Sequence, residues 1–278
     1  MAEFPHDDAA FTQGLEYDER CQPHGPCKPI FWESTGLNGQ SSVREVELTT
    51  GKVLRSKSLP KSDFGEGMTK LGKSLYQITW QTNKGWKYSV DNFDDATEIR
   101  TPLSDGWGAT SNDTHLILSD SSPILSFVDP HTMELVRQVE VTDGLISEDV
   151  PRTVKWLNEL EWVDGLIYAN VYTTECIAQI DPNTGSVVGW MVLKGLGQRM
   201  MASIPEAQRR ANWYPDVLNG IAWDGKGMRL FVTGKLWPKV YQIEARPMYV
   251  DSKATDVVAI LDEVRSSCIV DPDKGLGR

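Results

Sequence analysis

A short motif recurs five times along the chain, and it constrains the fold more than any other feature. In each copy a polar or aromatic residue precedes a small or acidic residue and then an apolar one, as in Gln13-Gly14-Leu15, Glu66-Gly67-Met68, Trp107-Gly108-Ala109, Asn158-Glu159-Leu160 and Asn219-Gly220-Ile221. The successive spacings of 53, 41, 51 and 61 residues match four-stranded propeller blades with loops of variable length. The repeat predicts an all-β fold, one five-bladed β-propeller domain that spans residues 1–278.

Turn-forming sequences separate the expected strands of each repeat. Asp164-Gly165 joins two apolar runs, and Asp-Gly favours a tight hairpin because that turn requires positive φ. Two insertions, 143–156 and 203–211, interrupt the rhythm and are expected on the channel face. The second insertion is predicted to be a short helix with Ser203 as its N-cap. Residues 256–265 are predicted to form a C-terminal helix, with a terminal strand as the alternative.

Composition limits the partners of such a domain. The net charge of −11 and pI near 4.9 leave no basic surface for nucleic acid, whose phosphates require clustered Lys and Arg. No stretch approaches the roughly 20 apolar residues that cross a bilayer, and residues 1–6 lack a hydrophobic signal core. We expect a monomer that binds neither nucleic acid nor membrane.

The cysteines point to an oxidising compartment. Cys21 and Cys27 flank a turn-forming stretch, and we expect a disulfide between them; zinc is the weaker alternative, because His24 is the only nearby histidine. Asn112 begins an N-glycosylation sequon, so the secretory pathway is the expected location. Cys176 lies in an apolar strand and is expected to be a buried free thiol. The sequence identifies no partner for Cys268 and leaves open whether Cys176 and Cys268 pair.

Two columns of residues should meet at one mouth of the propeller channel. The innermost strand of each blade lines the channel, so the first residues of the five motifs should form a ring of Gln13, Glu66, Trp107, Asn158 and Asn219. The ends of the second strands supply a second column: Thr35-Gly36, Trp80-Gln81, Asp120-Ser121, Tyr172-Thr173 and Gly234-Lys235. Solvated loop ends are the simpler alternative for this column. Together the columns predict a pocket with aromatic walls and a few polar groups.

Glu66 is the only carboxylate in the motif ring, and it indicates acid–base chemistry. None of the four histidines occupies a ring position, which disfavours a Ser-His-Asp system. The sequence also lacks an HExxH motif, a Walker loop and paired CxxC motifs. Desolvation beside indoles should favour the protonated form of Glu66, which suits a proton shuttle at neutral pH. The alternative role is a structural carboxylate hydrogen-bonded across the channel.

Several motifs, in order, resemble those of the plant-type glutaminyl cyclase family. They are Phe11-Thr12-Gln13-Gly14-Leu15, Glu33-Ser34-Thr35-Gly36, Phe64-Gly65-Glu66-Gly67-Met68, Trp107-Gly108, Leu157-Asn158-Glu159-Leu160-Glu161-Trp162, Leu218-Asn219-Gly220-Ile221-Ala222-Trp223 and Thr233-Gly234-Lys235-Leu236-Trp237-Pro238. The resemblance covers all five repeats and implies a five-bladed propeller. It also implies that the substrates are peptides or proteins with N-terminal glutamine, which the enzyme cyclises to pyroglutamate with release of ammonia.

The resemblance further implies roles for individual residues. Glu66 matches the family's essential acid, while Gln13, Asn158 and Lys235 match positions that bind the amide or stabilise the oxyanion. The substrate-binding positions are Phe11, Trp80, Trp107, Tyr172 and Asn219, with Tyr172 standing where the family commonly has tryptophan. The family uses no metal for catalysis, which leaves room only for a structural divalent cation in the channel.

Two other functions fit the same channel residues. Glu66, Asn158 and Asn219 offer oxygen atoms that suit Ca²⁺, so a calcium-dependent lactone hydrolase is one alternative. A propeller that binds peptides without catalysis is the other. Dependence on a divalent metal would favour the first, and the absence of turnover would favour the second.

Overall fold

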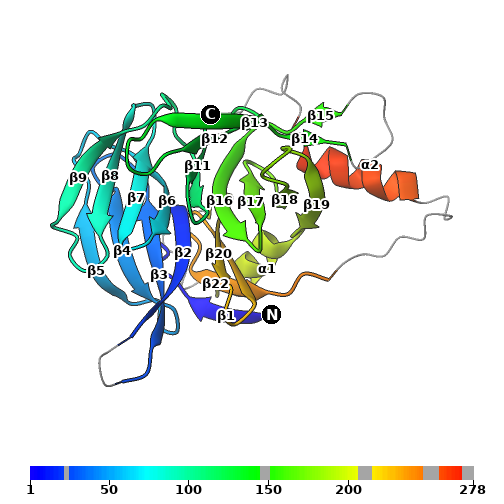
Figure 1. Cartoon of the computed structure of the whole chain (residues 1–278). Helices are drawn as coiled ribbons and strands as arrows, with labels where there is room; N and C mark the ends of the chain where they lie inside the picture. Colours follow the sequence, from blue (N-terminus) through cyan, green and yellow to red (C-terminus); the bar gives the residue numbers. More distant parts are fainter. Residues whose placement is uncertain (22–24, 145–150, 206–214, 247–256, 271–278) are drawn as a thin grey trace.

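Five four-stranded antiparallel sheets make up a β-propeller (Figure 1), as the motif repeat predicts. The computed structural model describes residues 1–21, 25–144, 151–205, 215–246 and 257–270. From inner to outer strand, the first four blades are β2–β5 (Thr12–Arg20, Lys28–Thr35, Ser42–Glu47, Val53–Ser58), β6–β9 (Gly65–Leu71, Ser74–Thr79, Lys84–Ser89, Ala96–Arg100), β10–β13 (Ala109–Ser111, Leu116–Ser119, Ile124–Val128, Leu135–Glu140) and β16–β19 (Leu157–Val163, Leu166–Val171, Cys176–Ile180, Val187–Val192).

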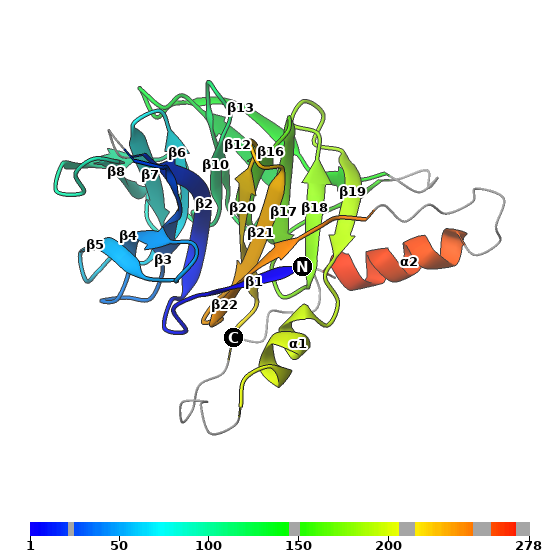
Figure 2. The same cartoon turned by 90° about the horizontal axis from the view of Figure 1, so that it is seen from below.

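The fifth blade combines the two ends of the propeller. Its strands are, from the inside, β20 (Leu218–Asp224), β21 (Arg229–Gly234), β22 (Lys239–Ile243) and β1 (Ala2–Pro5). β1 runs antiparallel to β22, with Ala2 opposite Gln242 and Pro5 opposite Lys239. Figure 2 shows β1 alongside β22, close to the N-terminus. Residues 2–5 therefore supply the strand that closes the ring, which the sequence pattern did not identify.

The five inner strands form a ring around the channel, in which β2, β6, β10, β16 and β20 each contact the next and β20 contacts β2. Small residues in the motif permit this close approach. A Cβ added at Gly14 would lie 2.5 Å from Met68 N of the next blade, and one at Gly108 would collide with Asn158 O. The glycines of the motif are thus explained by the narrowness of the channel.

A β-bulge coincides with the motif in four of the five blades. The pairing register shifts between Thr12 and Gly14, Gly65 and Met68, Leu157 and Leu160, and Leu218 and Ile221. Bulges beside functional sites commonly re-aim side chains, since the extra residue bends the strand. In these four blades the first residue of the motif is therefore displaced from the regular ladder.

The blades pack through apolar and aromatic interfaces. Between blades one and five, Phe31 meets Phe231 edge-to-face at 5.4 Å between ring centroids, and Tyr17 stacks on Phe231 at 5.7 Å. Aromatic pairs of this kind add about 0.5–1.5 kcal/mol each beyond burial of their area. Such interfaces hold the inner ring, and with it the channel, in a fixed geometry.

Local predictions met with different outcomes. Asp164 and Gly165 both have positive φ, 47° and 89°, and connect β16 to β17 as the hairpin signal predicts. The C-terminal helix is confirmed as α2 (Val257–Cys268). The sequence predicts Ser203 as the N-cap of a helix, but the structure makes it the C-cap of α1 (Leu196–Ala202). The Ser203 hydroxyl donates to Met200 O, and most of the predicted insertion helix, residues 206–211, lies outside the described residues.

The other insertion contributes a short ribbon. Within 143–156, β15 (Arg152–Thr153) pairs with β14 (Thr142–Asp143), and the segment 145–150 lies outside the described residues. Among the residues that the structure describes, no helix is long and apolar enough to cross a membrane.

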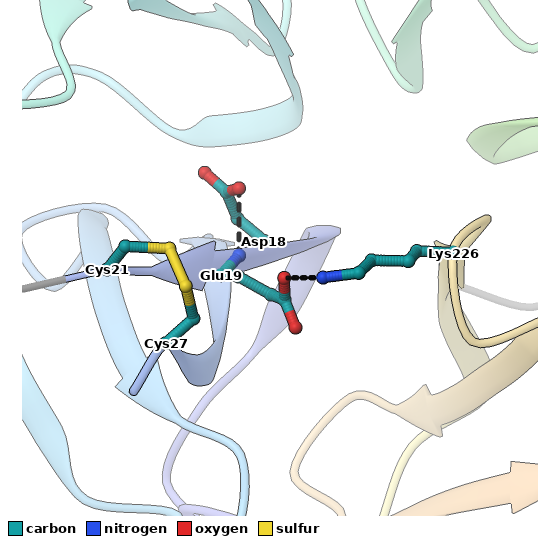
Figure 3. Close-up of a disulfide and its surroundings, with 5 residues drawn as sticks. All are labelled: Asp18, Glu19, Cys21, Cys27 and Lys226. Atoms are coloured by element: carbon teal, nitrogen blue, oxygen red, sulfur yellow. Dashed lines mark hydrogen bonds and ion pairs between the residues drawn. A yellow bond between two sulfur atoms is a disulfide. The ribbon is translucent and has the colours of Figure 1, made fainter. Parts of the chain in front are cut away.

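Two disulfides hold segments outside the sheets. Cys21–Cys27 closes the loop between β2 and β3, as predicted; Figure 3 shows it beside Glu19, which pairs with Lys226 of the fifth blade at 3.1 Å. The expectation of a free thiol at Cys176 is wrong, because Cys176 on β18 is bonded to Cys268 at the end of α2. This bond joins residues 92 positions apart in the sequence. Arg265, also on α2, forms a buried ion pair at 3.3 Å with Asp143 on β14. Together they attach α2 to blade four.

Candidate active site

A cavity of about 620 Å³ opens at one end of the channel. It is lined by Phe11, Gln13, Phe64, Glu66, Trp80, Gln81, Asp105, Trp107, Ser121, Trp156, Asn158, Tyr172 and Lys235. Eight of the nine site residues named from the sequence are in this lining, although they come from all five blades. The size and the mixed lining are typical of a small-ligand site.

Asn219 is the predicted site residue that the lining lacks. It is fully buried, and its Nδ2 donates to Gln13 Oε1 at 3.1 Å and to Thr12 O at 3.0 Å. Asn219 thus lies one layer behind the pocket wall and orients the Gln13 carboxamide. The motif position recurs in blade five, but there the side chain bonds to the neighbouring blade, and a role of Asn219 in substrate binding stays a prediction.

The second column of residues owes its direction to a repeated backbone conformation. In every blade the residue after this position has positive φ: Leu37 (81°), Gln81 (51°), Ser121 (68°), Thr173 (68°) and Leu236 (63°). The left-handed residue turns the chain sharply after the second strand. The equivalent positions are therefore Gly36, Trp80, Asp120, Tyr172 and Lys235, so the sequence alignment of this column is shifted by one residue in blades one and five.

A third set of residues completes the pocket, and we call it the outer ring. Each of its members lies two residues before a motif in the sequence. Backbone hydrogen bonds define it, from Trp80 N to Phe64 O (3.0 Å), Tyr172 N to Trp156 O (2.9 Å) and Lys235 N to Val217 O (3.0 Å). Its members in the lining are Phe11, Phe64, Asp105 and Trp156. Asp105, Phe64 and Trp156 are pocket residues that were not predicted from the sequence. Their constant offset from the motif is the signal that could have found them.

Glu66 is the acid at the centre of the pocket. Its side chain is buried, and burial raises its pKa well above 4.5; the Lys235 charge opposes this rise and the Asp105 charge adds to it. No hydrogen bond to its carboxyl is found among the described residues. Burial therefore favours the protonated form of the Glu66 carboxyl, because desolvation penalises its charged form.

Lys235 faces Glu66 from the fifth blade. Its Nζ lies 4.9 Å from the Phe11 ring centroid and 5.2 Å from that of Tyr172, which places the amine between two aromatic faces. Burial lowers its pKa below 10.5, while the charges of Glu66 and Asp216 oppose that change. The aromatic faces favour the cationic form, because the ring quadrupole attracts a positive charge.

The walls are aromatic and in contact with one another. Trp80 packs edge-to-face on Phe64 at 5.5 Å between centroids, and Trp107 packs on Tyr172 at 5.4 Å and on Trp156 at 6.0 Å. Such walls exclude water and stiffen the pocket, which strengthens the electrostatic interactions inside it.

Buried polar atoms without partners face this cavity. Within the described part of the chain, Asn158 Oδ1, Trp107 Nε1, Trp156 Nε1 and Asp105 Oδ1 are buried and make no hydrogen bond of normal geometry. Burial raises the pKa of Asp105, although the indoles of Trp107 and Trp80 and the Ser121 hydroxyl oppose the rise. Polar groups left unsatisfied in a folded protein cost free energy, so the pocket is built to receive a polar ligand.

A structural cation in the channel receives no support from the geometry. In the ranges that the structure describes, no group of three or more His, Cys, Asp and Glu side chains could hold a metal ion.

Fold and site together define a five-bladed propeller whose channel ends in an aromatic pocket that holds one buried carboxyl, Glu66, and one buried amine, Lys235. Comparison with known proteins narrows this class. The family model for glutamine cyclotransferase matches residues 1–245. The chain is 43% identical over 246 residues to the glutaminyl-peptide cyclotransferase of Arabidopsis thaliana, covering 88% of this chain and 70% of that protein.

A solved structure agrees with these sequence matches. The crystal structure of Myxococcus xanthus glutaminyl cyclase superposes with a TM-score of 0.70 at 31% identity, covering 88% of this chain and 94% of that one. The chain belongs to the glutamine cyclotransferase family.

Proposed function

We propose that the protein cyclises the N-terminal glutamine of peptides and proteins to pyroglutamate and releases ammonia, with Glu66 as the proton relay. The observation that carries this proposal is the buried carboxyl of Glu66, whose pKa is raised by burial, which shares a pocket walled by indoles with the Lys235 amine. Family membership supports the reaction, and the geometry supports the assignment of residues to it.

The substrate glutamine would fill the inner part of the pocket. Its side-chain amide is both donor and acceptor, which matches the carboxamides of Gln13 and Asn158. The peptide group that follows glutamine offers a carbonyl acceptor and an N–H donor. These match the unpartnered Trp156 Nε1 and Asp105 Oδ1 in the outer ring. The pocket thus selects an N-terminal residue that is attached to a peptide.

The reaction requires one proton to move between two nitrogen atoms. The neutral α-amine attacks the side-chain carbonyl carbon, which forms a C–N bond and a tetrahedral oxyanion. Glu66 gives its proton to the amide nitrogen, that C–N bond breaks, and ammonia leaves. The carboxylate then takes the surplus proton of the ring nitrogen, which restores the acid. No other reactant is consumed.

Lys235 and Asn158 stabilise the oxyanion in this scheme. A positive charge held in a water-excluded site acts strongly on developing negative charge, because little solvent screens it. Loss of one such donor typically costs about 3 kcal/mol at the transition state. The positions of Trp80, Trp107 and Tyr172 around the side chain keep water away from the activated carbonyl.

Incubation with a glutaminyl peptide tests the proposal directly. Ammonia should appear in equal amount to cyclised peptide, measured by a coupled assay and by mass spectrometry. EDTA should leave the rate unchanged, whereas a calcium-dependent hydrolase would lose its activity. Absence of ammonia release from mildly acidic to mildly basic pH would exclude the cyclase function.

We further propose that the protein acts as a monomer in the secretory pathway. Two disulfides support an oxidising compartment. The sequon residue Asn112 lies in an exposed turn, where its Oδ1 accepts from Thr114 N at 2.9 Å, and a glycan could be attached without displacing the core. Mass analysis of the protein from a eukaryotic host would reveal the glycan.

A further inference from the structure

The segment that follows the closing strand β1 holds two site residues in place. His6 N donates to Pro238 O at 2.9 Å, and Leu236 N donates to Ala10 O at 2.8 Å. These bonds fasten the loop after β21, which carries Lys235, to the residues that lead into β2. Gln13 lies three residues beyond Ala10, so both sides of the pocket depend on the same segment.

The His6 side chain is the third and most deeply buried link. Its Nδ1 lies 2.6 Å from Trp237 O, and its Nε2 lies 2.9 Å from Glu33 Oε1. Glu33 is fully buried, and its Oε1 also accepts from Thr12 Oγ1 at 2.8 Å. The ring therefore joins the Lys235 loop on one side to the residue before Gln13 on the other.

This geometry fixes the protonation state of the ring. A backbone carbonyl can only accept a hydrogen bond, so Nδ1 must carry a proton. Glu33 Oε1 accepts from Thr12, and a carboxylate there requires a donor at Nε2 as well. With protons on both nitrogens the ring is cationic, and it forms a buried ion pair with Glu33.

The charged groups around the pair agree with this state. Arg44 Nη1 lies 3.8 Å from Glu33 Oε2 and 2.7 Å from Asp7 Oδ2, so the cluster holds two cations and two anions. Burial alone would lower the pKa of His6, but Glu33, the Trp237 carbonyl and Asp7 outweigh it and raise that pKa above 6.5. Burial would raise the pKa of Glu33, and His6 and Arg44 lower it instead.

We propose that His6 is a positioning residue for the cyclisation, whose doubly protonated ring ties the Lys235 loop to the strand that carries Gln13. The inference rests on the proposed function, since it assumes that Lys235 and Gln13 act on the substrate. Without the bridge, Lys235 would keep its charge but lose its fixed distance from the oxyanion. A small misplacement of such a group is costly, because transition-state stabilisation depends on geometry.

A double-mutant cycle distinguishes positioning from general stability. His6→Gln should lower kcat/KM about tenfold, mainly through kcat, at a temperature where thermal unfolding shows the variant to be folded. In a Lys235→Ala background, the same change should lower kcat/KM by less than about twofold. The activity of these slow variants is measured by mass spectrometry over long incubations. If His6 has only a structural role, His6→Gln should lower kcat/KM by the same factor in both backgrounds, and that result would overturn the proposal.

Glu3→Gln is the matched control on β1, the strand that directly precedes His6. It removes the surface ion pair between Glu3 and Lys239 at 2.5 Å, which joins β1 to β22. It should leave kcat/KM within about twofold in both backgrounds. If Glu3→Gln lowers kcat/KM as much as His6→Gln does, any weakening of the closing strand has this effect, and the specific role of His6 is refuted.

The wild-type enzyme supplies a test that needs no variant of the bridge. The chain has four histidines, so ¹⁵N and ¹³C NMR can resolve the His6 ring. We expect a doubly protonated ring at pH 7.5, and a neutral ring would overturn the proposal even if His6→Gln failed to fold. Wild-type inactivity toward every glutaminyl peptide would instead refute the proposed function.

Discussion

Replacement of Glu66 by Gln is the sharpest test of the assigned chemistry. Gln has nearly the same size and keeps a carbonyl acceptor, but it cannot release and recover a proton. In the described part of the pocket lining, the other carboxyl is Asp105, which is only half-buried in the outer ring. The reaction therefore has no replacement acid at the required position.

The expected loss of activity is large because no other carboxyl among the described residues lies close enough to replace Glu66. Positioned acid–base groups contribute about 10²–10⁴-fold, or roughly 3–5 kcal/mol in activation free energy. With no second carboxyl at the inner ring, we expect Glu66→Gln to lower kcat by about 10³-fold or more. Stability should not fall, because a buried acid with a raised pKa loses native-state stability as pH rises through that pKa. Gln at this position is neutral at every pH.

The assay is ammonia release at saturating glutaminyl peptide, with binding followed by quenching of tryptophan fluorescence. KM and the peptide dissociation constant should change little, so the loss should lie in kcat. Glu161→Gln is the matched control, because Glu161 is also a buried inner-strand acid with a pKa raised well above 4.5 but does not line the pocket. A Glu66→Gln enzyme that retains more than a tenth of wild-type kcat would refute the proton-relay role.

Three further predictions concern the rim, the channel and the terminal helix. Trp156→Phe keeps a ring but removes the N–H donor, so KM for peptides should rise about tenfold while kcat changes little, as initial rates would show; an unchanged KM would contradict the contact. Burial raises the pKa of Glu16 to about 7 in the folded protein. Between pH 4.5 and 7 the unfolded chain therefore loses this proton before the folded protein does, and the free energy of unfolding should fall by roughly 3 kcal/mol over that range. Glu16→Gln should therefore flatten the urea-unfolding free energy over that pH range, and an unaltered slope would argue against the shift. Cys268→Ser should lower the unfolding free energy by about 2–5 kcal/mol with kcat unchanged, and an equal melting temperature would show that α2 adds nothing.

The sequence predicted the architecture because its signals are local and repeated. Gly14 and its counterparts recur at blade spacing, since every inner strand must approach the next one closely. Asp164-Gly165 predicted its hairpin because the turn needs positive φ at both residues. Five-fold repetition also placed Gln13, Glu66, Trp107 and Asn158 in one ring, as equivalent positions in a propeller share one mouth of the channel.

Features that depend on contacts between distant segments could not be predicted from the sequence. Cys176 bonds to Cys268 across 92 residues, and nothing in either local pattern specifies the partner. Asn219 has the same motif position as Glu66, yet it bonds to Gln13 because blades five and one meet there. Ser203 resembles an N-cap in sequence but ends α1 instead.

The sequence by itself determined the number of blades, the ring of motif residues and the acid that the ring contains. The tertiary structure alone decided which of them line the cavity. Bulges coincide with the motif in four blades, left-handed residues directly follow Trp80, Tyr172 and Lys235, and the residues two positions before the motifs add Asp105 and Trp156 to the lining. The physical reason is that a repeat sets the spacing of strands along the chain, whereas the closed ring sets the distances between side chains of different blades.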